Sequence, residues 1–336
     1  MNCPTVTARA PVRLDFAGGW TDVPPFSRDE GGVVVNAAIA LHARAHVAPR
    51  DHGIRLVAED LHESVELRDV REARADGRLD LLKAALRMTP PPGGCTVTTA
   101  CDAPPGGGLG SSGAMDVALM AALAAARGER LAPAAVAERG WRMETEEAGI
   151  AGGKQDQWIA ALGGVQRLEF RDPDVRATAL ALDPALLDEL GRRLVLCYTG
   201  RSRLSGTTIT RVVEGWTRGE AAIRGAFLAM RDAAERMSEA LVAGDLARVG
   251  ALLDANWAAQ QRLDAGMCTP EMARLEAAVR ATGVLGGKAA GSGAGGSMFF
   301  LARDPAAART AARATGAMLL PVAWDMTGVR VEADHP

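Results

Sequence analysis

The residues best suited to chemistry form a glycine-rich stretch in the first half of the chain. It leads into an apolar segment, Met115 to Ala126, and reads Pro104-Pro105-Gly106-Gly107-Gly108-Leu109-Gly110-Ser111-Ser112-Gly113-Ala114. Glycines let consecutive backbone N–H groups turn toward one point, and a following helix adds unpaired N–H groups and the positive end of its dipole. That combination binds phosphate. With the hydroxyls of Ser111 and Ser112 it predicts a nucleoside triphosphate site, and the alternative is a flexible surface loop.

Two further glycine-rich stretches carry charged residues. The segment 149–158 contains Lys154 and Asp156, and the segment 286–297 contains Lys288 and leads into an apolar strand. A formal G-x-G-x-x-G occurs at 108–113 and at 291–296, but neither lies in the strand-to-helix turn at the start of a dinucleotide-binding fold. No G-x-x-x-x-G-K-[ST] is present, which excludes a P-loop enzyme.

The sequence predicts the strands and helices that position the three glycine-rich stretches. Alternating and apolar patterns predict strands at 7–17, 31–48, 95–100, 164–170 and 193–199, a hairpin at 54–67, and helices at 80–88, 112–127 and 133–147. The second half predicts helices at 207–243, broken near Gly215 or Gly219, and at 245–264, 270–281 and 305–315, with strands at 298–301, 317–323 and 327–332. This order of elements indicates an α+β protein.

The length, composition and net charge of the chain limit the classes of function that it can have. A chain of 336 residues favours two domains, and Asp172-Pro173-Asp174 is a plausible boundary, giving domains 1–172 and 173–336. Hydrophobic content of 48% with 24% charged residues indicates a globular protein. A net charge of −3 and a single tyrosine, Tyr198, argue against nucleic-acid binding. We find no signal peptide or membrane span, so we expect a cytoplasmic protein whose five cysteines are reduced.

Three motifs in a fixed order resemble those of the GHMP kinases. They are Ala10-Pro11-Val12-Arg13 through Gly18-Gly19-Trp20-Thr21-Asp22, then Pro104 to Ala114, then Gly287-Lys288 through Gly296. Within that superfamily, Gly153-Lys154-Gln155-Asp156-Gln157 and Tyr198-Thr199-Gly200-Arg201-Ser202-Arg203 resemble the anomeric sugar kinases. The resemblance implies a two-domain fold, with an N-terminal α/β domain carrying the phosphate-binding glycine loop and a C-terminal ferredoxin-like α+β domain.

The resemblance also implies roles for charged residues around a bound ATP. Asp156 matches the catalytic aspartate that accepts the proton of the attacking hydroxyl; alternatively it caps the short helix that follows. Arg13 and Lys154 would supply fixed positive charge at the transferring phosphoryl group. Residues 105–113 would hold the nucleotide. Ser112 and Glu144 would hold Mg²⁺, which prefers oxygen ligands, although Glu146 and Glu147 stand close by and one of the three at most should face the nucleotide.

The implied acceptor is a sugar, held at its anomeric end. Asp22 would accept hydrogen bonds from two vicinal hydroxyls, or instead form an Asx turn before Pro24. Arg201 and Arg203 would bind a phosphate already on the sugar, which favours D-glycero-D-manno-heptose 7-phosphate. Trp20 favours instead an unphosphorylated sugar such as L-fucose. The other residues expected to contact substrate are Gly18, Gly19, Thr21, Gly153, Gly293 and Gly295.

The expected partners are therefore ATP with Mg²⁺ and a sugar or sugar phosphate, with no nucleic acid and no membrane, and a homodimer is possible. A catalytically silent protein of the same fold that senses a nucleotide or sugar is the competing class. Retention of both the candidate catalytic aspartate, Asp156, and the phosphate-loop glycines 106–108 argues against that class.

Overall fold

The computed structural model describes residues 3–202 and 206–333, without the side chains of residues 201–207. Its first sheet is built on two long antiparallel strands, β1 (Val6–Ala17) and β2 (Gly32–Pro49), which are buried over most of their length. The order is β12-β1-β2-β5-β3-β4, while β6 joins the other end of β2 and continues to β7. The remaining strands are β3 (Ile54–Ala58), β4 (Glu63–Leu67), β5 (Cys95–Cys101), β6 (Val165–Arg171), β7 (Asp174–Ala179) and β12 (Arg330–Ala333).

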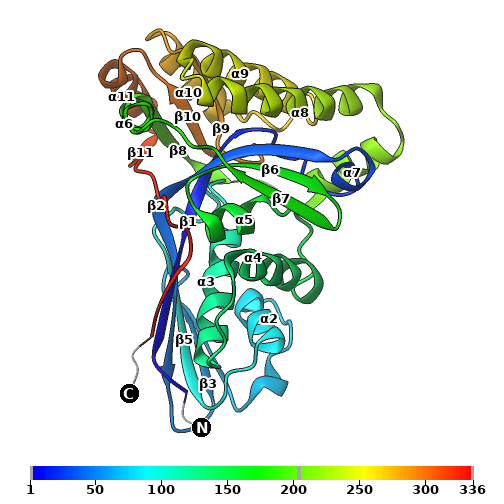
Figure 1. Ribbon diagram of the computed structural model, residues 1–336, viewed down its shortest axis with the longest axis vertical. Helices are drawn as coiled ribbons and strands as arrows, with labels where there is room; N and C mark the ends of the chain where they lie inside the picture. Colours follow the sequence, from blue (N-terminus) through cyan, green and yellow to red (C-terminus); the bar gives the residue numbers. More distant parts are fainter. Residues whose placement is uncertain (1–2, 203–205, 334–336) are drawn as a thin grey trace.

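Helices cover one side of this sheet (Figure 1). The central one, α3 (Ser111–Ala126), packs directly on β1 and β2 and is buried on nearly all sides, as its unbroken apolar sequence requires. Around it lie α2 (Asp80–Met88), α4 (Pro133–Arg142) and α5 (Gln155–Leu162). The predicted helix over 133–147 is shorter than expected, because the chain winds into a wider π-helical turn from Met143 to Glu147.

The second sheet is antiparallel, with strand order β11-β8-β10-β9. Its strands are β8 (Leu194–Ser202), β9 (Gly286–Ala289), β10 (Gly295–Leu301) and β11 (Met318–Leu320). Helices separate β8 from β9 and β10 from β11, so the chain follows the β-α-β-β-α-β path of a ferredoxin-like fold. The predicted ferredoxin-like C-terminal domain is confirmed.

The helices of the second half are α6 (Pro184–Arg193), α7 (Gly206–Thr217), α8 (Ala221–Val242), α9 (Leu246–Gln260), α10 (Pro270–Arg280) and α11 (Pro305–Ala314). The predicted break in the first long helical segment occurs at Gly219, whose φ of +73° only glycine adopts at little cost. Asp245 and Thr269 cap α9 and α10, because their side-chain oxygens accept from the backbone N–H groups of Arg248 and Met272. The short helix α1 (Phe26–Asp29) and the elements α6, β7 and β9 were not predicted.

The boundary predicted at residues 172–174 lies within the first sheet. These residues form the turn between β6 and β7, which pair antiparallel in the first sheet, and β12 returns to the same sheet beside β1. A proline-containing turn signals a hairpin as well as a linker, and only the pairing of Leu168 with Ala177 distinguishes the two. The chain therefore enters the second sheet at β8 and leaves it after β11.

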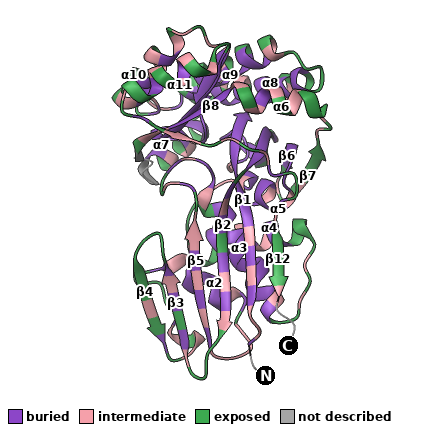
Figure 2. Cartoon of the chain, turned by 90° about the vertical axis from the view of Figure 1, so that its left-hand side faces the viewer, coloured by how far each residue is buried: buried purple, intermediate pink, exposed green. Residues whose placement is uncertain are grey.

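One core joins the two sheets. Side chains from β1, α3, α8 and β10 belong to a single buried cluster, in which Phe16 and Phe299 approach with ring centroids 5.5 Å apart. Figure 2 shows this buried interior, while β4 and β12 at the sheet edges carry exposed residues. Among the described residues, we find no helix whose length and apolar character would let it cross a membrane.

Candidate active site

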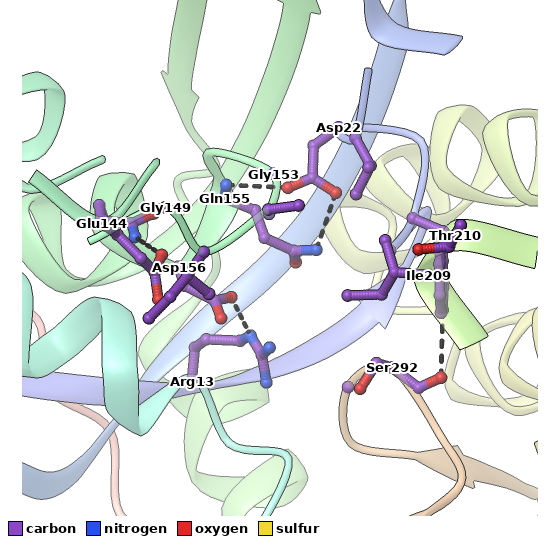
Figure 3. A pocket seen from close by; sticks show the side chains of 18 residues that line it. Arg13, Asp22, Glu144, Gly149, Gly153, Gln155, Asp156, Ile209, Thr210 and Ser292 are labelled. Carbon is purple, nitrogen blue, oxygen red and sulfur yellow. Dashed lines mark hydrogen bonds and ion pairs between the residues drawn. The ribbon is translucent and has the colours of Figure 1, made fainter. Parts of the chain in front are cut away.

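A cavity of about 580 Å³ opens where the first sheet, α5, α7 and the glycine-rich segment before β10 meet. Figure 3 shows side chains from these elements converging on it. Its lining consists of Arg13, Gly19, Trp20, Asp22, Val23, Glu144, Gly149, Ile150, Ala151, Gly152, Gly153, Gln155, Asp156, Gln157, Ile209, Thr210, Gly291 and Ser292.

The first glycine loop precedes α3 in a backbone conformation that needs glycine. Gly106, Gly108 and Gly110 have φ values of +66°, +71° and +74°, and Gly110 is the N-cap residue that precedes α3. No side chain in the described part of the chain caps this helix, so its first N–H groups are not satisfied by a neighbouring hydroxyl or carboxylate. The start of α3 therefore has backbone N–H groups free to donate, although residues 105–113 do not line the cavity itself.

The second glycine loop packs against the first. A Cβ on Gly291 would lie 2.3 Å from the carbonyl oxygen of Gly108, and one on Gly296 would lie 2.8 Å from that of Gly107. The N–H of Ser297 donates to Gly107 O at 2.8 Å. The glycines of this loop thus allow close contact between the two halves of the protein.

Gly293 and Gly295, which were predicted to contact substrate, do not line the cavity. Gly293 packs against Met267, and the N–H of Gly295 points to Met272 Sδ at 3.2 Å. Gly291 and Ser292 line the cavity instead. A turn within the loop, which the run of glycines does not reveal, decides which of them face the cavity.

Asp156 and Arg13 form an ion pair in the middle of the cavity wall. Arg13 Nε donates to Asp156 Oδ1 at 2.8 Å, and Arg13 Nη1 donates to the carbonyl oxygens of Gly108 at 2.7 Å and Ala290 at 3.0 Å. The Arg13 side chain is 6% exposed and that of Asp156 is 28% exposed. Asp156 lies inside the first turn of α5, and Lys154 occupies the capping position, so Asp156 does not cap that helix.

Lys154, which was predicted to supply charge at the transferring phosphoryl group, does not line the cavity. Its ammonium donates to the carbonyl oxygen of Pro173 at 2.8 Å, lies 3.3 Å from Asp172 Oδ1, and sits 4.1 Å from the centre of the Trp141 ring. The side chain is buried against α4 and the β6–β7 turn and does not line the cavity. Its charge is therefore matched by a nearby carboxylate and an aromatic face rather than by a ligand.

Of the three neighbouring glutamates, Glu144 is the one placed beside Ser112. Ser112 Oγ donates to Glu144 Oε1 at 2.7 Å, whereas Glu146 pairs with Arg142 and Glu147 with Arg87 on the exposed side. The wide turn after α4 directs Glu144 inward. Burial raises the pKa of the Glu144 carboxyl above its ordinary value, which is the behaviour of an acid whose ionised form lacks a compensating cation.

Asp22 is fully buried at the opposite side of the cavity from Glu144 (Figure 3). Its carboxylate accepts from the backbone N–H and from the side-chain amide of Gln155, both at 3.0 Å, so it does not serve an Asx turn. Burial is the main cause that raises the pKa of Asp22 to about 7. A Cβ on Gly153 would lie 1.9 Å from Asp22 Oδ2, which explains the glycine there.

Of the other residues in the segment 18–22, two line the cavity and two stabilise the conformation of the segment. Gly19 and Trp20 line the cavity, and Trp20 Nε1 donates to the Ser292 carbonyl oxygen at 3.1 Å. Gly18 and Thr21 do not line it: the Gly18 N–H donates to Asn256 Oδ1 at 2.9 Å, and Thr21 Oγ1 donates to Gly18 O at 2.7 Å. These two residues hold the shape of the segment.

The chain is similar to known proteins over most of its length. Residues 78–164 match the family described as GHMP kinases N terminal domain, and residues 237–318 match GHMP kinases C terminal. A D-glycero-α-D-manno-heptose 7-phosphate kinase from Campylobacter jejuni is 30% identical over 308 residues, which cover 90% of this chain and 90% of that protein. The chain belongs to the GHMP kinases.

Other relatives indicate which kind of GHMP kinase this chain is. The crystal structure of a D-glycero-D-manno-heptose 1-phosphate kinase from Bacteroides thetaiotaomicron matches with a TM-score of 0.79 and 25% identity, over 98% of this chain and 100% of that one. The L-fucokinase/L-fucose-1-P guanylyltransferase of Bacteroides fragilis is 28% identical over 90% of this chain, but over 35% of that longer protein. This GHMP kinase is a sugar kinase.

GHMP kinases use ATP as phosphate donor, generally with Mg²⁺, and the residues here fit both. The uncapped start of α3 offers backbone donors to phosphate, and Glu144 with Ser112 offers the oxygen ligands that Mg²⁺ prefers. Within the described residues, no group of three His, Cys, Asp or Glu side chains could hold a metal ion without a ligand's help.

Among the lining residues of this GHMP kinase that were not predicted are Gln155, Gln157, Ile209 and Thr210. The two glutamines flank Asp156 directly, and amides on either side of a candidate base are a signal that could have been read. Ile209 and Thr210 reach the cavity because α7 folds back over it, which no local pattern indicates. The side chains of Arg201 and Arg203 lie outside the described residues, so their predicted contact with a substrate phosphate stays a prediction.

Proposed function

We propose that this GHMP kinase transfers the γ-phosphoryl group of ATP to the anomeric hydroxyl of D-glycero-D-manno-heptose 7-phosphate, which yields the 1,7-bisphosphate. The observation that carries the proposal is the placement of Asp156, paired with Arg13, in one cavity with the buried carboxylate of Asp22. The cavity is large enough for a sugar. The names of the Campylobacter jejuni and Bacteroides thetaiotaomicron relatives support a heptose as acceptor.

Each carboxylate has a separate task in this proposal. Asp22 accepts hydrogen bonds from two neighbouring hydroxyls of the sugar and so orients the ring. Asp156 accepts the hydrogen bond of the anomeric hydroxyl and takes its proton as the new O–P bond forms and the bond to the β-phosphate oxygen breaks. Arg13 holds Asp156 in place and brings positive charge close to the transferring group. Bound Mg²⁺ would neutralise phosphate charge beside Glu144 and Ser112.

One observation favours a second candidate, an unphosphorylated sugar such as L-fucose. Among the described residues that line the cavity, Arg13 is the one cationic side chain, and it is already paired with Asp156. Trp20, Val23 and Ile209 give part of the wall an apolar character that suits a deoxy-sugar better than a phosphate. The name of the Bacteroides fragilis relative supports this candidate.

The test is ATP turnover with Mg²⁺ against a panel of sugars that includes heptose 7-phosphate, mannose 6-phosphate and L-fucose. We expect heptose 7-phosphate to have the highest kcat/KM, and Arg201→Ala and Arg203→Ala to raise its KM. A higher kcat/KM for L-fucose than for either sugar phosphate would replace the heptose proposal by the second candidate. Turnover of none of these sugars would reject both.

A further inference from the structure

The first turn of α5 presents three successive side chains to three different parts of the site. Gln155 contacts Asp22, Asp156 pairs with Arg13, and Gln157 contacts Glu144. Successive residues of an α-helix point about 100° apart, so one turn can serve three directions at once. Figure 3 shows Gln155 directed toward Asp22 and Asp156 toward Arg13.

Gln155 supplies two hydrogen bonds to the carboxylate of Asp22. The backbone N–H donates to Oδ2 and the side-chain amide Nε2 donates to Oδ1, each at 3.0 Å. Asp22 lies 133 residues away in sequence and is 2% exposed. A buried carboxylate needs donors on its oxygens, and the free N–H groups of a helix start are well suited to provide one.

Gln157 bridges two buried acids. Its Nε2 donates to Glu144 Oε2 at 2.7 Å and to Asp116 Oδ2 at 2.9 Å. The other oxygen of Glu144 accepts from Ser112, so both oxygens of this carboxylate are oriented. Gly140 leaves room for the contact, because a Cβ there would lie 3.2 Å from Asp116 Cβ and 3.5 Å from Gln157 Cγ.

The side-chain amides of Gln155 and Gln157 both turn their N–H groups toward the acids. Nε2 of each glutamine, and not its amide oxygen, lies within hydrogen-bond distance of the acids that it contacts. Within the described part of the chain, the amide oxygens of Gln155 and Gln157 are buried without a hydrogen-bond partner. The two side chains therefore stay in place through the acids they contact.

We propose that Gln155 and Gln157 are positioning residues that set the sugar-binding carboxylate and the metal-binding carboxylate at fixed places relative to the base between them. Gln155 acts through Asp22 on the acceptor, and Gln157 acts through Glu144 on the metal and nucleotide. The assignment of Asp22 and Glu144 to those ligands rests on the proposed function. The first turn of α5 thus fixes the positions of the sugar-binding carboxylate, the base and the metal-binding carboxylate relative to one another.

Replacement of Gln155 tests the acceptor half. Methionine has similar length and no N–H donor, so Gln155→Met removes the amide contact to Asp22 and keeps the backbone contact. Loss of one hydrogen bond to a charged group should raise the KM of whichever panel sugar is turned over by about tenfold, with kcat changed less than about threefold. An unchanged sugar KM would overturn this half.

Replacement of Gln157 tests the metal half without turnover. We expect Gln157→Met to weaken Mg²⁺ binding to the complex with ADP, measured by calorimetric titration, by about 10- to 100-fold, the usual effect of losing a group that orients a metal ligand. The KM of the sugar should stay within about twofold. Unchanged Mg²⁺ affinity would overturn this half, even if no sugar on the panel were turned over.

Gln166→Met is the matched control. Gln166 is also a buried glutamine, on β6, and its amide donates to the Gly163 carbonyl oxygen at 2.8 Å, away from the cavity. We expect this variant to leave sugar KM and Mg²⁺ affinity unchanged. If it changed both as strongly as the site variants do, general loosening of the fold would replace positioning as the explanation.

A double substitution separates positioning from packing. If Gln155 acts through Asp22, Gln155→Met should raise the sugar KM less than about twofold in an Asp22→Asn background, because the partner it orients is already altered. A full tenfold effect in that background would show that Gln155 acts independently of Asp22 and would reject the proposal. Thermal melting of each variant establishes that the comparison is made between folded proteins.

Discussion

At the scale of single residues, the ion pair of Arg13 and Asp156 is the centre of the site. Arg13 makes three hydrogen bonds, one to Asp156 and two to backbone carbonyl oxygens on the two glycine loops. An arginine held in this way has little freedom left, so it orients the carboxylate instead of following it. Arg13 therefore stays in place without Asp156, and the role left to Asp156 in the proposed reaction is to accept the proton.

The first prediction concerns Asp156. Asp156→Asn keeps the shape of the side chain but removes the proton acceptor, so we expect kcat to fall by about 10²- to 10⁴-fold. Binding of ATP, measured by calorimetric titration, should change by less than about threefold because Arg13 keeps its contacts with Gly108 and Ala290. Asp174→Asn, an exposed aspartate on β7, is the control. An active Asp156→Asn variant would contradict the assignment of the base.

The second prediction concerns pH. Because burial raises the pKa of Asp22 to about 7, its carboxylate is ionised above that pH and protonated below it. In the proposed function the ionised form accepts from two sugar hydroxyls, so the sugar KM should rise as the pH falls through 7, by about tenfold per pH unit in the acidic limit. Asp22→Asn should raise the KM and make it independent of pH in that range. A wild-type KM that stays flat across it would mean that Asp22 does not titrate there.

At the scale of elements, two glycine loops from different halves of the chain determine each other's shape. Gly108 and Gly291 approach so closely that a side chain on Gly291 would displace the first loop, while Gly110 begins α3 with a positive φ. The first glycine loop, for which we propose phosphate binding, is therefore supported by the segment that precedes β10. Small residues at the contact are needed for steric reasons as much as for flexibility.

The third prediction tests this support. In Gly291→Ala, the added Cβ would lie 2.3 Å from the carbonyl oxygen of Gly108, so the first loop must shift. We expect ATP affinity to fall by about tenfold or more, since a shift of about 1 Å misplaces several N–H donors together. Gly225→Ala in α8 is the control, because its Cβ meets no atom within 4 Å, and it should be neutral or slightly stabilising. Unchanged ATP affinity in Gly291→Ala would show that the loops move independently.

At the scale of the whole molecule, strand β1 connects the two sheets. Lys288 on β9 donates to the carboxylate of Asp15 on β1 at 2.9 Å and to its carbonyl oxygen at 2.7 Å, and neither side chain is exposed to solvent beyond 1%. Asp15 lies two residues from Arg13 and touches Gly19, whose Cβ would be 2.2 Å from Asp15 Oδ2. The pair thus links the two halves directly behind the cavity wall.

The fourth prediction concerns the stability of this link. Lys288→Met leaves a buried carboxylate without its partner, so we expect the free energy of unfolding in urea to fall by about 3–5 kcal/mol. The double variant Asp15→Asn with Lys288→Met should lose less than Lys288→Met alone, because no charge remains buried. Arg236→Ala, which breaks an exposed pair with Asp232, should change stability by less than about 0.5 kcal/mol. A Lys288→Met variant as stable as wild type would mean that the pair does not hold the halves together.

Much of this protein could be predicted from local pattern alone. Alternation placed β1, β2 and β5, caps and prolines placed α9, α10 and α11, and three ordered glycine motifs indicated both the family and the α+β fold. These features depend on the backbone preferences of a few neighbouring residues, so a sequence carries them directly. Asp156, Arg13, Asp22 and Ser112 were also singled out before their arrangement was known.

Only the tertiary structure decided which side chains meet. It turned Glu144 and not its neighbours toward Ser112, matched Lys154 with Asp172, placed Gln155 and Gln157 on two distant acids, and folded α7 over the cavity. It also made a hairpin of residues 165–179 and returned β12 to the first sheet. Each of these outcomes joins segments far apart in sequence, where packing and burial decide among several locally acceptable arrangements.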